Sequence, residues 1–132
     1  MSDSCWLTIT FMKGDKARIL EMFGVERMSE LSGDGDLWER WDINEAPYSL
    51  FDQRLKLSEL GVHFYGHHAA GGEYTSHCFV SWKGVMTDVM CVDSEPVARM
   101  LPDRNMAQID MSRCHRYYHD LRRVKEDMGI SW

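Results

Sequence analysis

The chain has 132 residues, of which 44% are hydrophobic and 27% are charged. This length and composition are typical of one globular domain and exclude a largely disordered chain. Fifteen Lys and Arg against 21 Asp and Glu give a formal net charge of -6, which disfavours direct binding to nucleic acid because such binding depends on cationic contacts with phosphates.

The first half of the chain shows patterns of both strands and helices. Apolar and polar residues alternate over residues 5–12, which predicts a half-buried strand. Asp15 as an N-cap and Gly24 as a C-terminal stop predict a short helix between them. The glycines and aspartates of residues 32–36 indicate a loop, and residues 37–43, with a Trp on each face, indicate a second strand.

The second half is predicted to contain more strands. Pro47 interrupts regular structure, and residues 49–61 are expected to be helical and to end at Gly61. Lys83 and Gly84 form a short connection that is compatible with a hairpin. Further strands are predicted over residues 62–66, 74–82 and 85–92, and residues 97–101 are a candidate for one more edge strand.

The clearest helical pattern lies in the C-terminal segment, residues 111–129. Apolar residues recur there at helical spacing, and Gly129 ends the pattern. The apolar stripe consists of Cys114, Tyr117, Leu121, Val124 and Met128. Because each residue of a helix advances by about 100 degrees, His115 and His119 are expected to point away from this stripe, into water.

The order of these elements predicts the fold class. Along the chain, the predicted order is strand, helix, strand, helix, three strands and a final helix. This order indicates an α+β domain rather than a doubly wound parallel sheet. We expect a mostly antiparallel sheet of about four to five strands with helices packed on one face, as in ferredoxin-like sandwiches. No linker or repeat interrupts the pattern, so residues 1–132 are expected to form a single compact domain.

Composition also bears on location and redox state. No apolar run approaches the roughly 20 residues of a membrane helix, and the N-terminal MSDSCWLTIT lacks the features of an export signal. We therefore expect a cytoplasmic protein without a membrane partner. The four cysteines have no C-x-x-C spacing, so buried thiols are expected rather than disulfides.

Residues 63–78, HFYGHHAAGGEYTSHC, hold four of the six histidines and one cysteine. On a strand, neighbouring residues point to opposite faces, so only alternate members of this segment can act together. One alternative function is therefore a metal-binding or hydrolytic enzyme, although no motif joins the candidate groups and no metal, cofactor or catalytic residue is predicted. The candidates are His63, His67, His68, His77 and Cys78, with Cys114, His115 and His119 in the C-terminal helix.

The same segment contains a candidate ligand loop formed by Gly71, Gly72, Glu73 and Tyr74. Glycine allows the tight bend, and its amides could approach an anion. The chain contains neither G-x-x-x-x-G-K-[ST] nor G-x-G-x-x-G, so nucleotide binding is not predicted. A small-ligand-binding domain is a further alternative.

Acidic residues are concentrated in the first half, where residues 1–66 hold 12 acids and seven bases. Residues 34–45, DGDLWERWDINE, carry five acids and one Arg. Tryptophan beside charge is favoured in contact surfaces, whereas the alternative is a solvated strand with its tryptophans in the core. The candidate partner-binding residues are Asp34, Asp36, Trp38, Glu39, Trp41, Asp42 and Glu45.

The favoured hypothesis is a small acidic, non-catalytic protein-binding module. An exposed acidic stretch complements a basic surface, and proteins that hold nucleic acid present such surfaces. A rigid acidic domain that occupied such a surface in place of nucleic acid would act as an inhibitor. In size and charge the chain is similar to inhibitors encoded by phages and mobile elements, including anti-CRISPR and anti-restriction proteins, although it shares no motif with them.

Overall fold

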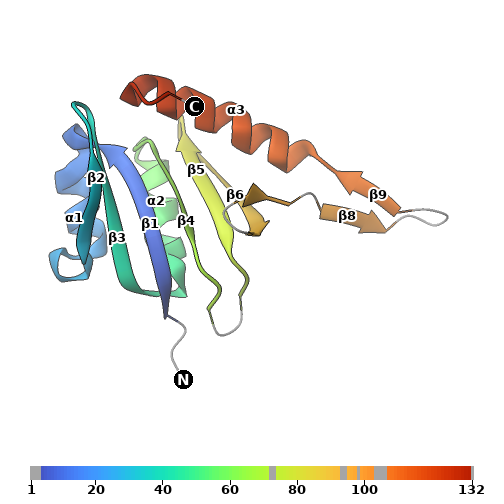
Figure 1. Ribbon diagram of the computed structural model, residues 1–132, viewed down its shortest axis with the longest axis horizontal. Helices are drawn as coiled ribbons and strands as arrows, with labels where there is room; N and C mark the ends of the chain where they lie inside the picture. Colours follow the sequence, from blue (N-terminus) through green and yellow to red (C-terminus); the bar gives the residue numbers. More distant parts are fainter. Residues whose placement is uncertain (1–3, 72–73, 93–94, 98, 103–106, 132) are drawn as a thin grey trace.

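The computed structural model describes residues 4–71, 74–92, 95–97, 99–102 and 107–131. These residues form an α+β fold with a seven-stranded antiparallel sheet and three α-helices (Figure 1). The helices are α1 (Lys16–Phe23), α2 (Phe51–Glu59) and α3 (Ser112–Met128), with short 3₁₀ helices η1 (Lys13–Asp15), η2 (Val25–Arg27) and η3 (Tyr48–Leu50). The strands of the sheet are β1 (Ser4–Met12), β2 (Glu30–Asp34), β3 (Trp38–Pro47), β4 (Phe64–His68), β5 (His77–Trp82), β6 (Val85–Val92) and β7 (Glu95–Pro96).

Strand β1 lies inside the sheet, whose order is β2-β3-β1-β4-β5-β6-β7. It pairs with β3 on one side and with β4 on the other, antiparallel in both cases. The strand predicted over residues 5–12 is therefore confirmed, but it is not half-buried, because Thr8 and Thr10 on its other face are buried as well. Its alternating residues Leu7, Ile9 and Phe11 have no exposed surface, because this face of β1 carries the first hydrophobic core.

Helices α1 and α2 cover one face of the sheet and build that first core. Alternate residues of β1, β3 and β4 point toward these helices, as the two-residue period of a strand requires. The core includes Leu7, Ile9 and Phe11 of β1, Ile19 and Phe23 of α1, Ile43 of β3, Leu57 of α2, Phe64 of β4 and Phe79 of β5. Removing this apolar surface from water is the main contribution of these elements to stability.

Helix α3 packs on the opposite face, over β4, β5 and β6 (Figure 1). The apolar stripe predicted for this helix is confirmed, since all five of its residues are buried. The expectation that the helices pack on one face is wrong. The reason lies in β5, where Cys78, Phe79 and Val80 are buried in succession, so that this strand is apolar on both faces and needs a cover on each.

The sheet also has more strands than the four to five expected, because two short segments join its edges. Residues 32–36 were expected to form a loop, but residues 30–34 pair with β3 as β2, with a register shift between Leu31 and Gly33. At the other edge, Glu95 and Pro96 pair with β6. A separate two-stranded ladder, β8 (Arg99–Pro102) and β9 (Ala107–Asp110), extends away from the main sheet (Figure 1).

Among the described residues, no helix combines the length and the apolar character needed to cross a membrane.

Candidate functional site

The histidine-rich segment forms β4, the start of β5 and the connection between them. The two strands are antiparallel, with His68 opposite His77 and His67 opposite Cys78. Because side chains alternate between the faces of a sheet, His68 and His77 share the face of α2, whereas His67 and Cys78 share the face of α3. The prediction that only alternate members of the segment can act together is confirmed.

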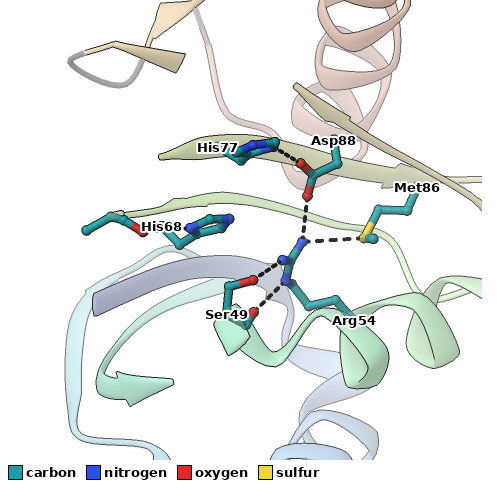
Figure 2. A network of polar contacts seen from close by, with 7 residues as sticks. Ser49, Arg54, His68, His77, Met86 and Asp88 are labelled. Carbon is teal, nitrogen blue, oxygen red and sulfur yellow. Dashed lines mark hydrogen bonds and ion pairs between the residues drawn. The ribbon is translucent and has the colours of Figure 1, made fainter. Parts of the chain in front are cut away.

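His68 and His77 lie side by side (Figure 2). Their imidazole rings are nearly parallel, at 7°, with centroids 5.5 Å apart. Nδ1 of His68 donates to the carbonyl of Ala69 at 2.8 Å, and Nδ1 of His77 bonds to Oδ1 of Asp88 on β6. Burial lowers the pKa of His68, so this imidazole is neutral at neutral pH.

Arg54 joins Asp88 to helix α2. Its side chain has no exposed surface, and its guanidinium lies 4.2 Å from the centroid of the Phe79 ring. It donates to Oδ2 of Asp88 at 3.1 Å, and to the carbonyl and Oγ of Ser49 at 2.9 Å each (Figure 2). Burial by itself raises the pKa of Asp88, but the hydrogen bond from His77 and the charge of Arg54 outweigh it and lower that pKa. Asp88 is therefore ionised and balances Arg54.

The turn that precedes α2 is strained. Tyr48, Ser49 and Leu50 have φ angles of 50, 54 and 51 degrees, in the left-handed region that residues with a Cβ rarely adopt. Such residues cost about 1–3 kcal/mol each and persist only where the surrounding structure holds them. The two hydrogen bonds from Arg54 hold Ser49 in this conformation.

This turn forms one wall of a cavity of about 230 Å³. The exposed rings of Tyr48 and Phe51 stand at the cavity, and the ionisable groups come from the sheet. The lining residues are Tyr48, Ser49, Phe51, His68, Tyr74, His77 and Asp88. Apolar rings and a few polar groups therefore converge, which is the usual composition of a ligand site.

The predicted ligand loop borders this cavity. Gly71 and Tyr74 are described, whereas Gly72 and Glu73 lie outside the described residues. The amide of Gly71 donates to the carbonyl of Tyr74 at 3.0 Å. A Cβ at Gly71 would overlap the Tyr74 ring, so glycine allows this ring to lie where it does. The ring packs edge-on against His68, with centroids 5.7 Å apart.

Cys78, the cysteine of the histidine-rich segment, is unsuited to nucleophilic catalysis at neutral pH. All four cysteines are buried and none forms a disulfide, as the sequence predicts. Burial, together with a hydrogen bond to Cys91, raises the pKa of Cys78 to about 12. Since the thiolate is the reactive form of cysteine, Cys78 is almost entirely protonated and unreactive near pH 7.

The remaining candidate histidines do not join His68 and His77. His115 and His119 are exposed on α3, as expected from the helical stripe, and His119 bonds to Asp120 at 2.9 Å. The sheet separates them from the cavity, because α3 packs on the other face. His63 instead accepts a hydrogen bond from the amide of Lys83 at 3.0 Å.

Strand β3 divides the predicted partner-binding residues between the two faces of the sheet. Glu39 and Trp41 face α1, where Nζ of Lys16 lies 3.2 Å from Oε1 of Glu39 and Nε1 of Trp41 donates to the same oxygen at 2.9 Å. Trp41 also packs against the first core. These two residues are therefore half-buried and already have partners.

Trp38 and Asp42 face the opposite side. The guanidinium of Arg40 lies 4.9 Å from the Trp38 ring centroid, and Oδ1 of Asp42 accepts from Thr8 at 2.8 Å. Asp34, Asp36 and Glu45 are exposed. The stretch is thus acidic on both faces of one hairpin, and its tryptophans are partly covered rather than free to insert into a partner.

Reasoning from the sequence missed Arg54, Asp88 and Ser49. A signal was present for two of them. Asp88 is an acid inside the otherwise apolar strand pattern of residues 85–92, and Arg54 lies three residues before the core residue Leu57 on α2. A charge placed at a buried position requires a partner, but the sequence does not identify which charges are paired.

Comparison with protein-family models, with curated proteins and with solved structures found no match for this chain. The function is therefore argued from the residues themselves.

Proposed function

We propose that this chain is a small, non-catalytic protein-binding module whose acidic hairpin engages a basic protein surface. The acidic hairpin is defined as β2, β3 and the turn between them, residues 30–47. The observation that carries the proposal is the placement of carboxylates directly opposite other carboxylates within this hairpin.

The register of β2 and β3 sets Glu30 opposite Asp42 and Asp34 opposite Glu39. Like charges directly across two strands are destabilising. Within the described part of the chain, Glu39 is the one member of these pairs with an ion-pair partner, Lys16. A cationic partner at Glu30 and Asp34 would relieve this repulsion, since no ion pair to either residue is present among the described residues.

The acidic hairpin also offers apolar contacts beside its charges. Leu31 on β2 is 46% exposed, and Leu37, just before β3, is 50% exposed. An interface needs a desolvated apolar centre as well as a complementary charged rim. Because Trp38 and Trp41 are partly covered, we assign this role to Leu31 and Leu37. The net charge of -6 would speed encounter with a basic partner.

We further propose that the basic partner is a nucleic-acid-handling protein, which this chain inhibits by occupying the nucleic-acid site. Support comes from charge complementarity alone, since a groove that binds phosphates also attracts a rigid array of carboxylates. An inhibitor of a defence complex, as in phages and mobile elements, is one case of this activity.

The test compares two variants with the same change in charge. One replaces the exposed acids of the hairpin, Asp34→Lys, Asp36→Lys and Glu45→Lys. The other replaces exposed acids elsewhere, Glu21→Lys, Asp52→Lys and Glu59→Lys. Glu39 and Asp42 are left intact because Lys16 and Thr8 use them.

Binding to a short oligolysine is measured across a series of salt concentrations. The hairpin variant should bind about tenfold or more weakly, and the wild-type affinity should fall with salt. The control variant should retain most of its affinity. Equal losses in both variants would show that net charge alone is responsible and would refute the assigned surface. Proteins captured from a lysate by the wild type should be displaced by duplex DNA, and capture insensitive to DNA would count against the nucleic-acid-handling partner.

We also propose that residues 4–68 form a ferredoxin-like unit. The chain order β1, α1, β2, β3, α2, β4 and the sheet order β2-β3-β1-β4 support this assignment. Both helices of the unit contribute to the same core. In this proposal β5, β6 and α3 extend the unit beyond β4.

A further inference from the structure

The cavity beside the strained turn contains a set of metal-ligand side chains that lies outside the acidic hairpin. A ring nitrogen of His68, a ring nitrogen of His77 and a carboxylate oxygen of Asp88 all lie within 4.8 Å of one another. They come from three adjacent strands, β4, β5 and β6, so the sheet fixes their backbones relative to one another (Figure 2). We propose that these three residues bind a divalent transition-metal ion, with Zn²⁺ as the best match.

The donor types favour zinc over harder ions. Two imidazoles and one carboxylate form the set that zinc uses in sites with an open coordination position, whereas Ca²⁺ and Mg²⁺ prefer all-oxygen sets. Donors at about 2.0–2.1 Å from a tetrahedral zinc ion are about 3.3 Å apart. The three donor atoms lie within 4.8 Å of one another, so the side chains must move slightly closer together to bind the ion. Rotation about their χ angles can provide this movement.

The histidine His68 is already in the form that binds metal. A carbonyl oxygen can only accept a hydrogen bond, so the contact with Ala69 places the His68 proton on Nδ1 and leaves Nε2 with a free lone pair. An imidazole held in this way by a backbone carbonyl is the usual arrangement of a metal-binding histidine.

Arg54 acts on the site through Asp88. It donates to Oδ2 of Asp88, which orients the carboxylate and leaves Oδ1 directed at His77. Metal binding would replace the hydrogen bond between His77 and Oδ1 by bonds from both groups to the ion, with the His77 proton moving from Nδ1 to Nε2 so that Nδ1 has a lone pair for the ion. The positive charge of Arg54 opposes the charge of the ion, so affinity should be lower than for the same donors without an arginine.

The cavity provides space for the remaining coordination positions. Its volume of about 230 Å³ is enough for several water molecules, each of which occupies roughly 30 Å³ in the liquid. The ion would therefore have its protein ligands on the sheet side and water, or a small ligand donor, on the side of Tyr48 and Phe51.

The test uses the full-length chain after treatment with a chelator. Co²⁺ is added as a spectroscopic probe, and Zn²⁺ is then used to displace it. We expect one ion per chain, visible d–d bands, and no thiolate-to-cobalt charge-transfer band, because no cysteine is among the donors. Replacing His68→Gln or His77→Gln should weaken binding by more than about tenfold. The matched controls His115→Gln and His119→Gln, exposed on α3, should bind as the wild type does.

Circular dichroism checks that each variant is folded. X-ray absorption of the wild-type zinc complex gives a second result that needs no substitution, and it should show two imidazole nitrogens with oxygen in the remaining positions. Three results would each overturn the proposal: sulfur in the coordination shell, metal binding that survives both His68→Gln and His77→Gln, or failure of the wild type to bind Co²⁺ and Zn²⁺. None of these results depends on the acidic hairpin, so the two proposals are tested separately.

Discussion

Arg54 and Asp88 form an ion pair between helix α2 and strand β6, with Nη1 and Oδ2 3.1 Å apart. The Arg54 side chain is fully buried and that of Asp88 is largely buried. A buried charge is stable only when it is paired and hydrogen-bonded. Ser49 accepts two of the other hydrogens of the guanidinium. This one side chain therefore links the strained turn, α2 and the sheet.

The substitution Arg54→Met should reduce the free energy of unfolding by about 3–5 kcal/mol. It leaves the Asp88 carboxylate without its counter-charge and removes the two hydrogen bonds that Ser49 accepts from Arg54. Urea unfolding followed by tryptophan fluorescence measures the change. The double variant Arg54→Met, Asp88→Asn should lose less than the sum of the two single losses, because the two residues interact. Strictly additive losses would show that the ion pair contributes nothing.

The substitution Gly66→Ala should destabilise the protein by about 3 kcal/mol or more. A Cβ at Gly66 on β4 would overlap the carbonyl oxygen of Thr8 on the neighbouring strand and meet the Phe79 ring. Backbone atoms inside a sheet cannot move aside without loss of pairing. Gly14→Ala is the control, since nothing lies within 4 Å of a Cβ there. Thermal unfolding of both variants should show a large fall in Tm for the first and little change for the second.

The substitution Lys83→Asn should stabilise the protein by about 0.5–1 kcal/mol. Lys83 has φ of 50 degrees and Gly84 has φ of 80 degrees, which a two-residue turn between β5 and β6 requires. Asparagine tolerates positive φ better than lysine. Lys83→Ala removes the contact of the lysine with the Trp82 ring without helping the turn, so it should destabilise. If both variants changed Tm equally, turn geometry would not be the cause.

Stability should fall as the pH rises through the alkaline range. Burial raises the pKa of Cys78 from 9.0 to about 12, and burial also raises the pKa of Tyr117. Between about pH 9 and pH 12 the unfolded chain has released the Cys78 proton and the folded chain has not. A rise in pH therefore stabilises the unfolded state relative to the folded state. Each such group lowers the free energy of unfolding by about 1.4 kcal/mol per pH unit.

Urea unfolding at successive pH values through this window measures that slope. Cys78→Ala removes one ionisation, so its stability should depend less steeply on pH than that of the wild type, even though the cavity it creates lowers stability at every pH. A variant slope as steep as the wild-type slope would exclude Cys78 as a cause.

Local sequence patterns correctly predicted the elements in which apolar residues recur regularly over many positions. The strand over residues 5–12 and the apolar stripe of α3 were both confirmed, because their apolar residues recur at the period of a strand and of a helix. The alternation did not predict that Thr8 and Thr10, on the polar face of β1, are buried too. Residues 30–34 were missed as a strand. Their glycine and exposed polar residues resemble a loop, and they are held by pairing with β3 rather than by burial.

The candidate site shows the same limit. Sequence alternation established that His67 and His68 point to opposite faces, and likewise His77 and Cys78. It could not show that His68 would lie opposite His77, or that Asp88 and Arg54 would meet there. Strand register and the packing of α2 determine those contacts.

The sequence by itself determined the class of fold, the buried faces of β1 and α3, and the overall acidity, since these depend on neighbours along the chain. Only the tertiary structure decided which strands adjoin, that α3 covers the second face, and that two histidines, an aspartate and an arginine converge. The contact between Arg54 and Asp88, for example, joins residues 34 positions apart. Their formation depends on the fit of the whole core, which no local pattern encodes.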